Sequence, residues 1–187
     1  MSATDRERLL ERLRRDAYRA GTFTLASGKT SDFFVDCKKV MLTAEGHALA
    51  GACLADAVDA AERASGVRFD NVAGVALGGC PLASAVALIS FQRGRGLDAL
   101  YVRKEAKDHG TRALVEGAAK PGARVALLED VLTTGGSSRA AIERLREAGY
   151  VVDAVFALVD RREGAVEHLA SHGVRVTSLF AREDFVR

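Results

Sequence analysis

The chain has few cysteines, no marked excess of positive or negative charge, and no long apolar run that could serve unbroken as a membrane helix. Its cysteines, Cys37, Cys53 and Cys80, are odd in number, with no C-x-x-C motif and no histidine at ligand spacing. Neither a disulfide framework nor a zinc site is therefore predicted, and the compartment should be reducing. With 27 Lys and Arg against 25 Asp and Glu, the formal net charge is only +2. This balance argues against non-specific nucleic-acid binding, which needs a basic excess.

Two segments bear on secretion and membrane insertion. Residues 1–21 alternate charged residues with leucines and lack the apolar core of a secretory signal, so we expect a cytoplasmic protein without a membrane part. Residues 72–89 carry no charge and are about long enough to span a bilayer. Such a helix would be broken near its middle by Gly74, Gly78, Gly79 and Pro81. This segment instead predicts a buried strand over 72–77, a glycine loop, and a helix starting at Pro81.

Apolar runs alternate with helical patterns along the chain. Strands are predicted at 72–77, 99–102, 125–128, 152–159 and 174–180, with short extended pieces near 23–25 and 33–35. Helices are predicted at 5–20, 43–64, 81–92 and 137–148, followed by a final turn at 163–171. Continuous Val, Leu and Ala strands separated by helices indicate a parallel sheet covered on both faces. Without repeats or linkers, the sequence predicts a single α/β domain over 1–187.

The segment 125–138 joins a buried strand to two acids, Glu129 and Asp130, and then to a Thr/Gly/Ser loop that opens a helix. Backbone N–H groups over 134–137 suit a phosphate, because the peptide dipoles at a helix N-terminus favour an anion. Open α/β sheets place ligands at the carboxyl ends of their strands, where paired carboxylates suit a diol such as ribose. The segment predicts a ribose 5-phosphate site, with a tight turn and capped helix as the alternative.

A group of basic residues and a single arginine also follow predicted strands. The segment 103–110 contains Arg103, Lys104, Lys107 and His109 and has no apolar helical face. It suits a mobile cationic loop for pyrophosphate, although a solvated charge run in a surface hairpin has the same composition. Arg161 follows the strand 152–159 and should share the edge of Asp130, where its planar guanidinium fits a carboxylate. The alternative for Arg161 is an exposed arginine at a strand end.

Four segments carry a resemblance to a known family. Residues 129–137, Glu-Asp-Val-Leu-Thr-Thr-Gly-Gly-Ser, resemble the signature loop of the type I phosphoribosyltransferases. The segments 23–31, 103–110 and 159–164 narrow the resemblance to the orotate phosphoribosyltransferases and spread it over most of the chain. It implies the type I phosphoribosyltransferase fold, a central parallel sheet flanked by helices. A small hood would be formed by about 1–40 and the C-terminal segment.

The resemblance also implies an activity, the transfer of ribose 5-phosphate from phosphoribosyl pyrophosphate to orotate in pyrimidine (UMP) biosynthesis. Mg²⁺ is implied as a cofactor held mainly through substrate oxygens and water, without a dedicated protein metal site, and the active sites would be shared in a homodimer. Asp130, Lys107 and His109 would be catalytic, Thr133 and Arg161 would bind orotate, and the 77–80 turn would lie on the pyrophosphate side. Phosphoribosyl pyrophosphate would be bound by Arg103, Lys104, Lys107, His109, Glu129, Asp130, Val131, Leu132, Thr133, Thr134, Gly135, Gly136 and Ser137.

Two positions depart from some members of the family, which carry lysines where this chain has Ala26 and Gly78. Their absence leaves less positive charge near the base and the diphosphate, so either the affinity differs or another cation, such as Lys29, compensates. Phe33 and Phe34 suit stacking on a pyrimidine and also packing in the core or an interface.

Two other functions are weighed against this one. The first is transfer to a different base such as a purine, against which Arg161 and the 103–110 segment argue. The second is a non-catalytic regulator that senses phosphoribosyl pyrophosphate and binds nucleic acid. A basic extension or a winged-helix segment would favour the regulator, and the sequence shows neither.

Overall fold

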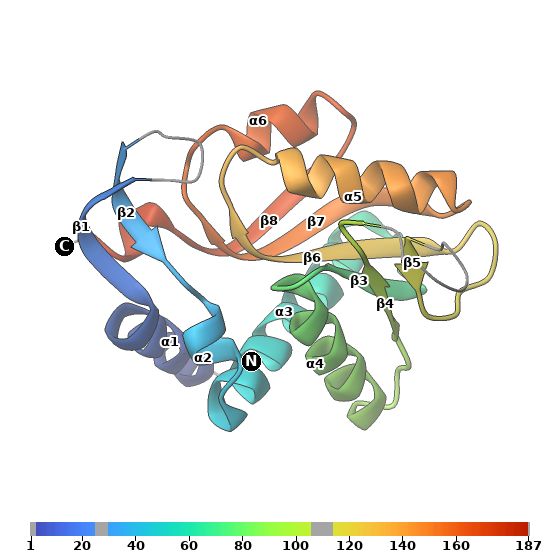
Figure 1. Cartoon of the computed structure of the whole chain (residues 1–187). Coiled ribbons are helices and arrows are strands. Elements are labelled where there is room, and N and C mark those ends of the chain that lie inside the picture. The colour runs from blue at the N-terminus through green and yellow to red at the C-terminus, as the bar shows by residue number, and fades with distance from the viewer. Residues whose placement is uncertain (1–2, 25–29, 106–113, 187) are drawn as a thin grey trace.

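The computed structural model describes residues 3–24, 30–105 and 114–186. Within these ranges the centre is a six-stranded sheet with the order β5-β4-β3-β6-β7-β8 (Figure 1). The strands are β3 Asn71–Val75, β4 Asp98–Val102, β5 Val115–Glu116, β6 Arg124–Leu132, β7 Val151–Asp160 and β8 Arg175–Ala181. β5 runs antiparallel to β4, and the other neighbours are parallel. The α/β class and the parallel central sheet are confirmed.

Helices cover both faces of this sheet. α3 Ala44–Ser65 and α4 Gly79–Gln92 lie on one face, with α5 Gly136–Glu147 and α6 Ala165–Ala170 on the other (Figure 1). Successive strand residues point to opposite faces, and the apolar residues of β6 divide accordingly. Ala126 and Leu128 belong to one core, and Val125 and Leu127 to the other. Burial on both faces explains why the strands are continuously apolar.

A smaller antiparallel sheet pairs β1 Tyr18–Thr24 with β2 Thr30–Val35 in the described part of the chain. α1 Ala3–Arg12 and the π-helical turn Leu13–Ala17 precede it, and the short helix α2 Lys38–Met41 follows it. The C-terminal segment, which includes the 3-10 turn Arg182–Asp184, packs onto this unit. The rings of Tyr18, Phe33 and Phe185 lie with centroids 5.1 to 5.6 Å apart, so the two ends of the chain share one aromatic cluster.

The helix expected over 5–20 ends before its predicted end. Tyr18 already pairs with Val35, and Ala20 pairs with Phe33, in the β1–β2 ladder. A strand whose partner lies far along the chain leaves little local signal. α2 and β5 are two further elements that the sequence pattern does not predict.

The uncharged run 72–89 divides into β3, a turn and most of α4, as predicted. α4 begins at Gly79, so Pro81 lies within its first turn, where proline is tolerated. Over the three described ranges, no helix combines the length and the apolar character needed to cross a membrane.

Candidate active site

Most of the predicted site residues that the structure describes lie at the carboxyl edge of the sheet. β4, β3, β6 and β7 are parallel neighbours, so the segments that follow them meet at one edge (Figure 1). The turn 76–78 follows β3, Arg103 and Lys104 follow β4, the loop 133–135 follows β6, and Arg161 follows β7. Two predicted catalytic residues, Lys107 and His109, lie outside the described residues.

The loop after β6 leads directly into α5. Gly135 has a φ of 81° in the left-handed region, immediately before the first residue of the helix. A Cβ at this position would also lie 3.3 Å from the Leu169 side chain, so both conformation and space favour glycine. Thr134, Gly136 and Ser137 are exposed. The free N–H groups and the dipole of this 12-residue helix therefore face solvent, where they suit an anion.

Glu129 is buried beside the start of α5, with 4% of its surface exposed. Its Oε1 accepts hydrogen bonds from Ser138 Oγ at 2.7 Å and from Ser137 Oγ at 3.5 Å. Burial raises the pKa of Glu129 to about 7, although the Ser138 hydroxyl favours the charged form. Ser138 is a site residue that the sequence analysis missed. Its signal was the second serine of the Ser137–Ser138 pair.

The side chain of Asp130 points to the opposite face from that of Glu129, because neighbouring residues of a strand alternate. A Cβ built on Gly78 would lie 2.3 Å from Asp130 Oδ2, so the glycine backbone packs directly on this carboxylate. Val131 N donates to Asp130 Oδ1 at 2.9 Å, and Cys37 Sγ lies 3.7 Å from the Asp130 carbonyl oxygen. Burial raises the pKa of Asp130, and the Val131 hydrogen bond opposes that shift.

Arg161 is 7% exposed, so it is not an exposed arginine at a strand end. Its backbone N donates to the Leu132 carbonyl at 2.9 Å, which fixes it beside the end of β6. Arg161 Nη2 lies 2.7 Å from Glu163 Oε1, and its guanidinium carbon lies 5.9 Å from the centroid of the Phe33 ring. Phe33 is fully buried, so it packs in the core, whereas Phe34 remains partly exposed.

The base of the cationic segment is attached to α5. Arg144, on that helix, donates to the carbonyl oxygens of Arg103 at 2.8 Å and Lys104 at 2.9 Å. Arg103 Nη1 lies 3.2 Å from Glu116 Oε1. The charge of Lys104 lowers the pKa of Glu129, against the larger opposite effect of burial. Lys104 therefore lies within electrostatic reach of Glu129.

The few carboxylates at this edge suit a magnesium ion that is bound largely through substrate oxygens and water. Among the residues that the structure describes, no group of three or more His, Cys, Asp or Glu side chains is arranged to hold a metal. Mg²⁺ usually keeps several waters and takes one or two carboxylates together with substrate phosphates. Asp130 can supply one such carboxylate once substrate oxygens are added, whereas Glu129 lies on the opposite face of β6 with its Oε1 bonded to Ser138.

Comparison with known proteins decides the family. A curated orotate phosphoribosyltransferase of Sorangium cellulosum (strain So ce56) is 54% identical over 186 residues, which cover 98% of this chain and 94% of the relative. The chain belongs to the orotate phosphoribosyltransferase family. Another member, from Thermosynechococcus vestitus, is 47% identical over 180 residues, covering 96% of this chain and 92% of that relative. No family model matches the chain.

Solved structures of orotate phosphoribosyltransferases have the same fold. The enzyme of Mycobacterium tuberculosis H37Rv, in complex with 5-phospho-alpha-D-ribosyl 1-diphosphate, aligns with a TM-score of 0.77 and 32% identity over 97% of this chain and 98% of that chain. The type I phosphoribosyltransferase fold expected from four short segments is thereby confirmed over nearly the whole chain.

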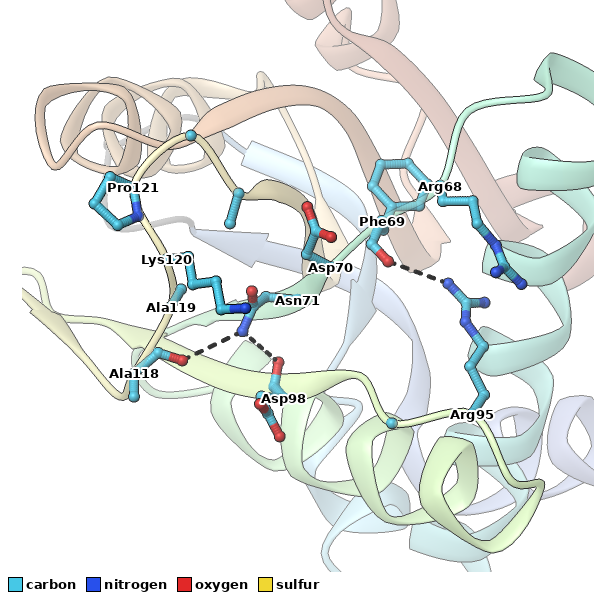
Figure 2. Close-up of a pocket in the computed structure, with 13 residues that line it drawn as sticks. Arg68, Phe69, Asp70, Asn71, Arg95, Asp98, Ala118, Ala119, Lys120 and Pro121 are labelled. Atoms are coloured by element: carbon cyan, nitrogen blue, oxygen red, sulfur yellow. Dashed lines mark hydrogen bonds between the residues drawn. The ribbon is translucent and has the colours of Figure 1, made fainter.

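A cavity of about 840 Å³ lies at the opposite edge, where β3, β4 and β6 begin (Figure 2). Its charged lining comprises Arg68, Asp70, Arg95, Asp98 and Lys120. Asn71 donates to the carbonyl oxygens of Asp98 at 3.4 Å and Ala118 at 3.5 Å across its floor. None of the residues that the orotate phosphoribosyltransferase resemblance assigns to substrate lines this cavity, so the reaction is better placed at the carboxyl edge.

Proposed function

We propose that the chain transfers the ribose 5-phosphate unit of phosphoribosyl pyrophosphate to N1 of orotate, giving orotidine 5′-monophosphate and pyrophosphate. One observation carries this proposal: a phosphate cradle, a carboxylate and a buried arginine meet at one sheet edge. The start of α5 suits the 5-phosphate. Asp130 suits the ribose diol, and Arg161 suits the orotate carboxylate. The family relationship supports this choice of reaction.

The 5-phosphate is bound by the N–H groups and hydroxyls of 134–137, with Val131, Leu132 and Thr133 completing the strand end. Asp130 accepts hydrogen bonds from the ribose hydroxyls, and Glu129 adds Oε2 as a further acceptor while Oε1 holds Ser138. As the bond to the diphosphate lengthens, positive charge develops at the anomeric carbon. The nearby Asp130 carboxylate stabilises that charge more than it stabilises the neutral ground state.

Orotate is oriented by Arg161, whose planar fork suits the carboxylate that uracil lacks. Glu163 holds the guanidinium from one side, so the arginine is positioned before the substrate arrives. Thr133 contacts the base from the end of β6. A purine lacks this carboxylate and would leave the buried arginine without its substrate partner.

The diphosphate is bound by Arg103 and Lys104, with Lys107 and His109 supplied by the partner subunit of a homodimer. An exposed apolar surface on α4 supports this dimer. Leu88 and Phe91 of α4 are 54% and 75% exposed, and Ser84, on the same side of the helix, hydrogen-bonds to the Tyr101 hydroxyl of β4. Apolar surface of this kind marks protein interfaces.

Mg²⁺ would be held mainly through substrate oxygens and water beside Asp130, and when bound it would neutralise part of the charge on the departing diphosphate. Closure of the cationic segment would exclude water and so suppress hydrolysis of the activated ribose.

The experiment is a transfer assay with Mg²⁺ and phosphoribosyl pyrophosphate, run in parallel with orotate, uracil and adenine. We expect loss of orotate absorbance and formation of a nucleotide product with orotate only. Transfer to adenine in preference to orotate would overturn the proposal, and so would binding of phosphoribosyl pyrophosphate without transfer to any base.

A further inference from the structure

Residues 36–38, which lead from β2 into the first residue of α2, pack on the end of β6 beside Asp130. Asp36 N donates to the Ala17 carbonyl at 3.1 Å, which anchors the segment to the N-terminal unit. Cys37 is fully buried, with its Sγ 3.7 Å from the carbonyl oxygen of Asp130. The next residue, Lys38, is thereby brought to the site edge.

Lys38 and Asp130 interact electrostatically. The pKa of Lys38 is raised first by its hydrogen bond to Asp36, and the charges of Asp36 and Asp130 add to that shift. In turn, the charge of Lys38 lowers the pKa of Asp130, against the dominant effect of burial. The Lys38 ammonium group therefore lies within electrostatic reach of the carboxylate that the proposed reaction uses.

The Lys38 ammonium retains capacity for another ligand. Its Nζ lies 2.7 Å from Asp36 Oδ1, and the side chain is 43% exposed. An ammonium group carries three N–H donors, so one bond to Asp36 leaves two for a ligand. Asp36 and Asp130 place two carboxylates near Lys38, and an anionic substrate group needs a cation to approach them. Gly78, which packs on the Asp130 carboxylate, has no side chain to supply one.

We propose that Lys38 binds an anionic substrate oxygen beside Asp130, and that this oxygen belongs to the diphosphate of phosphoribosyl pyrophosphate. The diphosphate is bonded to the anomeric carbon, next to the hydroxyls assigned to Asp130, and it carries more charge than the single carboxylate of orotate. The inference rests on the proposed function and deepens it. Lys38, whose position the structure describes, takes the compensating role that the sequence pattern suggested for Lys29.

The test compares Lys38→Ala with Lys39→Ala. Lys39 is the adjacent lysine on the same short helix, is exposed, and has no assigned role in the site. Isothermal titration calorimetry measures the binding of inorganic pyrophosphate, in the presence of Mg²⁺, and of orotate separately. Loss of a charged hydrogen bond should weaken pyrophosphate binding by about tenfold or more in Lys38→Ala. Orotate binding should be unchanged, and Lys39→Ala should match the wild type for both.

Each other outcome has a definite meaning. Weaker binding of orotate alone would keep Lys38 as a substrate-binding cation and reassign its partner to the orotate carboxylate. Equal binding of both ligands by the Lys38 and Lys39 variants would overturn the inference. Lys38→Gln, which keeps the length of the side chain without the charge, replaces Lys38→Ala if thermal unfolding shows that the alanine variant is unfolded. Binding of pyrophosphate does not depend on turnover, so an inactive wild type would contradict the proposed function without deciding the role of Lys38.

Discussion

Gly78 lies so close to Asp130 that a methyl group on residue 78 would stand 2.3 Å from the carboxylate oxygen Oδ2. In Gly78→Ala either the turn or the carboxylate must move. A displacement of about 1 Å in a reacting group costs on the order of 100-fold in rate. We therefore expect kcat/KM to fall by at least about tenfold while the protein stays folded, as steady-state kinetics and thermal unfolding would show.

Gly94→Ala is the control for that variant. Gly94 has a φ of 75°, and a Cβ added there would meet nothing within 4 Å, so alanine strains the backbone without touching the site. It should lower the melting temperature and leave kcat/KM unchanged. Wild-type kinetics in Gly78→Ala would show that the Asp130 carboxylate can move without loss of activity. Gly78 would then not fix its position.

Asp130→Asn tests the charge at the same position. The amide keeps the shape of the carboxylate but cannot stabilise positive charge at the anomeric carbon, so kcat should fall by about 100-fold or more. Asp98→Asn, in the cavity at the opposite edge of the sheet, is the matched control and should retain wild-type kcat. If instead Asp98→Asn were inactive and Asp130→Asn active, the reaction would belong to the other edge.

Arg161→Ala should affect the KM for orotate and the KM for phosphoribosyl pyrophosphate differently. Loss of a charged hydrogen bond to a carboxylate costs about 2 kcal/mol, so the KM for orotate should rise by about 30-fold. The KM for phosphoribosyl pyrophosphate should change little. Arg162→Ala, at the next residue, removes a guanidinium that pairs with Asp160 and Glu183 and should leave both constants near wild type. An equal rise of both constants in Arg161→Ala would mean that the arginine supports the site in general.

Glu129 makes the stability of the protein without substrate depend on pH. Burial raises its folded pKa to about 7 from an ordinary value of 4.5, so the folded state holds this proton more tightly than the unfolded state. Between these two values the unfolded state binds fewer protons, and the free energy of unfolding falls as pH rises. The contribution is on the order of a few kcal/mol. It is fully present below about pH 4.5 and is lost by about pH 7.

Thermal unfolding from pH 5 to pH 8 (roughly the window in which this proton is released) measures the effect as the difference between the wild type and Glu129→Gln. The glutamine variant should lack this component. Ser138→Ala removes a hydroxyl that favours the charged carboxylate and should extend the loss of stability to higher pH. Parallel curves for the wild type and Glu129→Gln would show that Glu129 is already ionised throughout the range.

The segments that could be predicted from sequence are those whose signal is local. The run 125–138 shows a buried strand, two acids and a glycine loop in order, and this order is confirmed, although β6 extends beyond the predicted end at 128, through both acids to Leu132. The end of the first helix could not be predicted in this way, because Tyr18 becomes extended through pairing with Val35, 17 positions away in the sequence. Lys38 was missed for a similar reason, since only folding brings residues 36–38 onto Asp130. The motif indicated Asp130 itself, but not the contact with Gly78 that fixes its position.

The shared active site is tested by mixing two inactive variants, Lys107→Ala and Asp130→Asn. In a two-fold symmetric dimer, each site would combine its own Asp130 with the partner's Lys107. A mixed dimer then has one site with both defects and one site with neither. Random exchange makes half of the dimers mixed, and each has one intact site of two, so activity should recover to at most about a quarter of wild type. Mass spectrometry of the mixture confirms exchange. If exchange is complete and the mixture stays as inactive as its parents, Lys107 acts within its own subunit and each subunit holds a complete site.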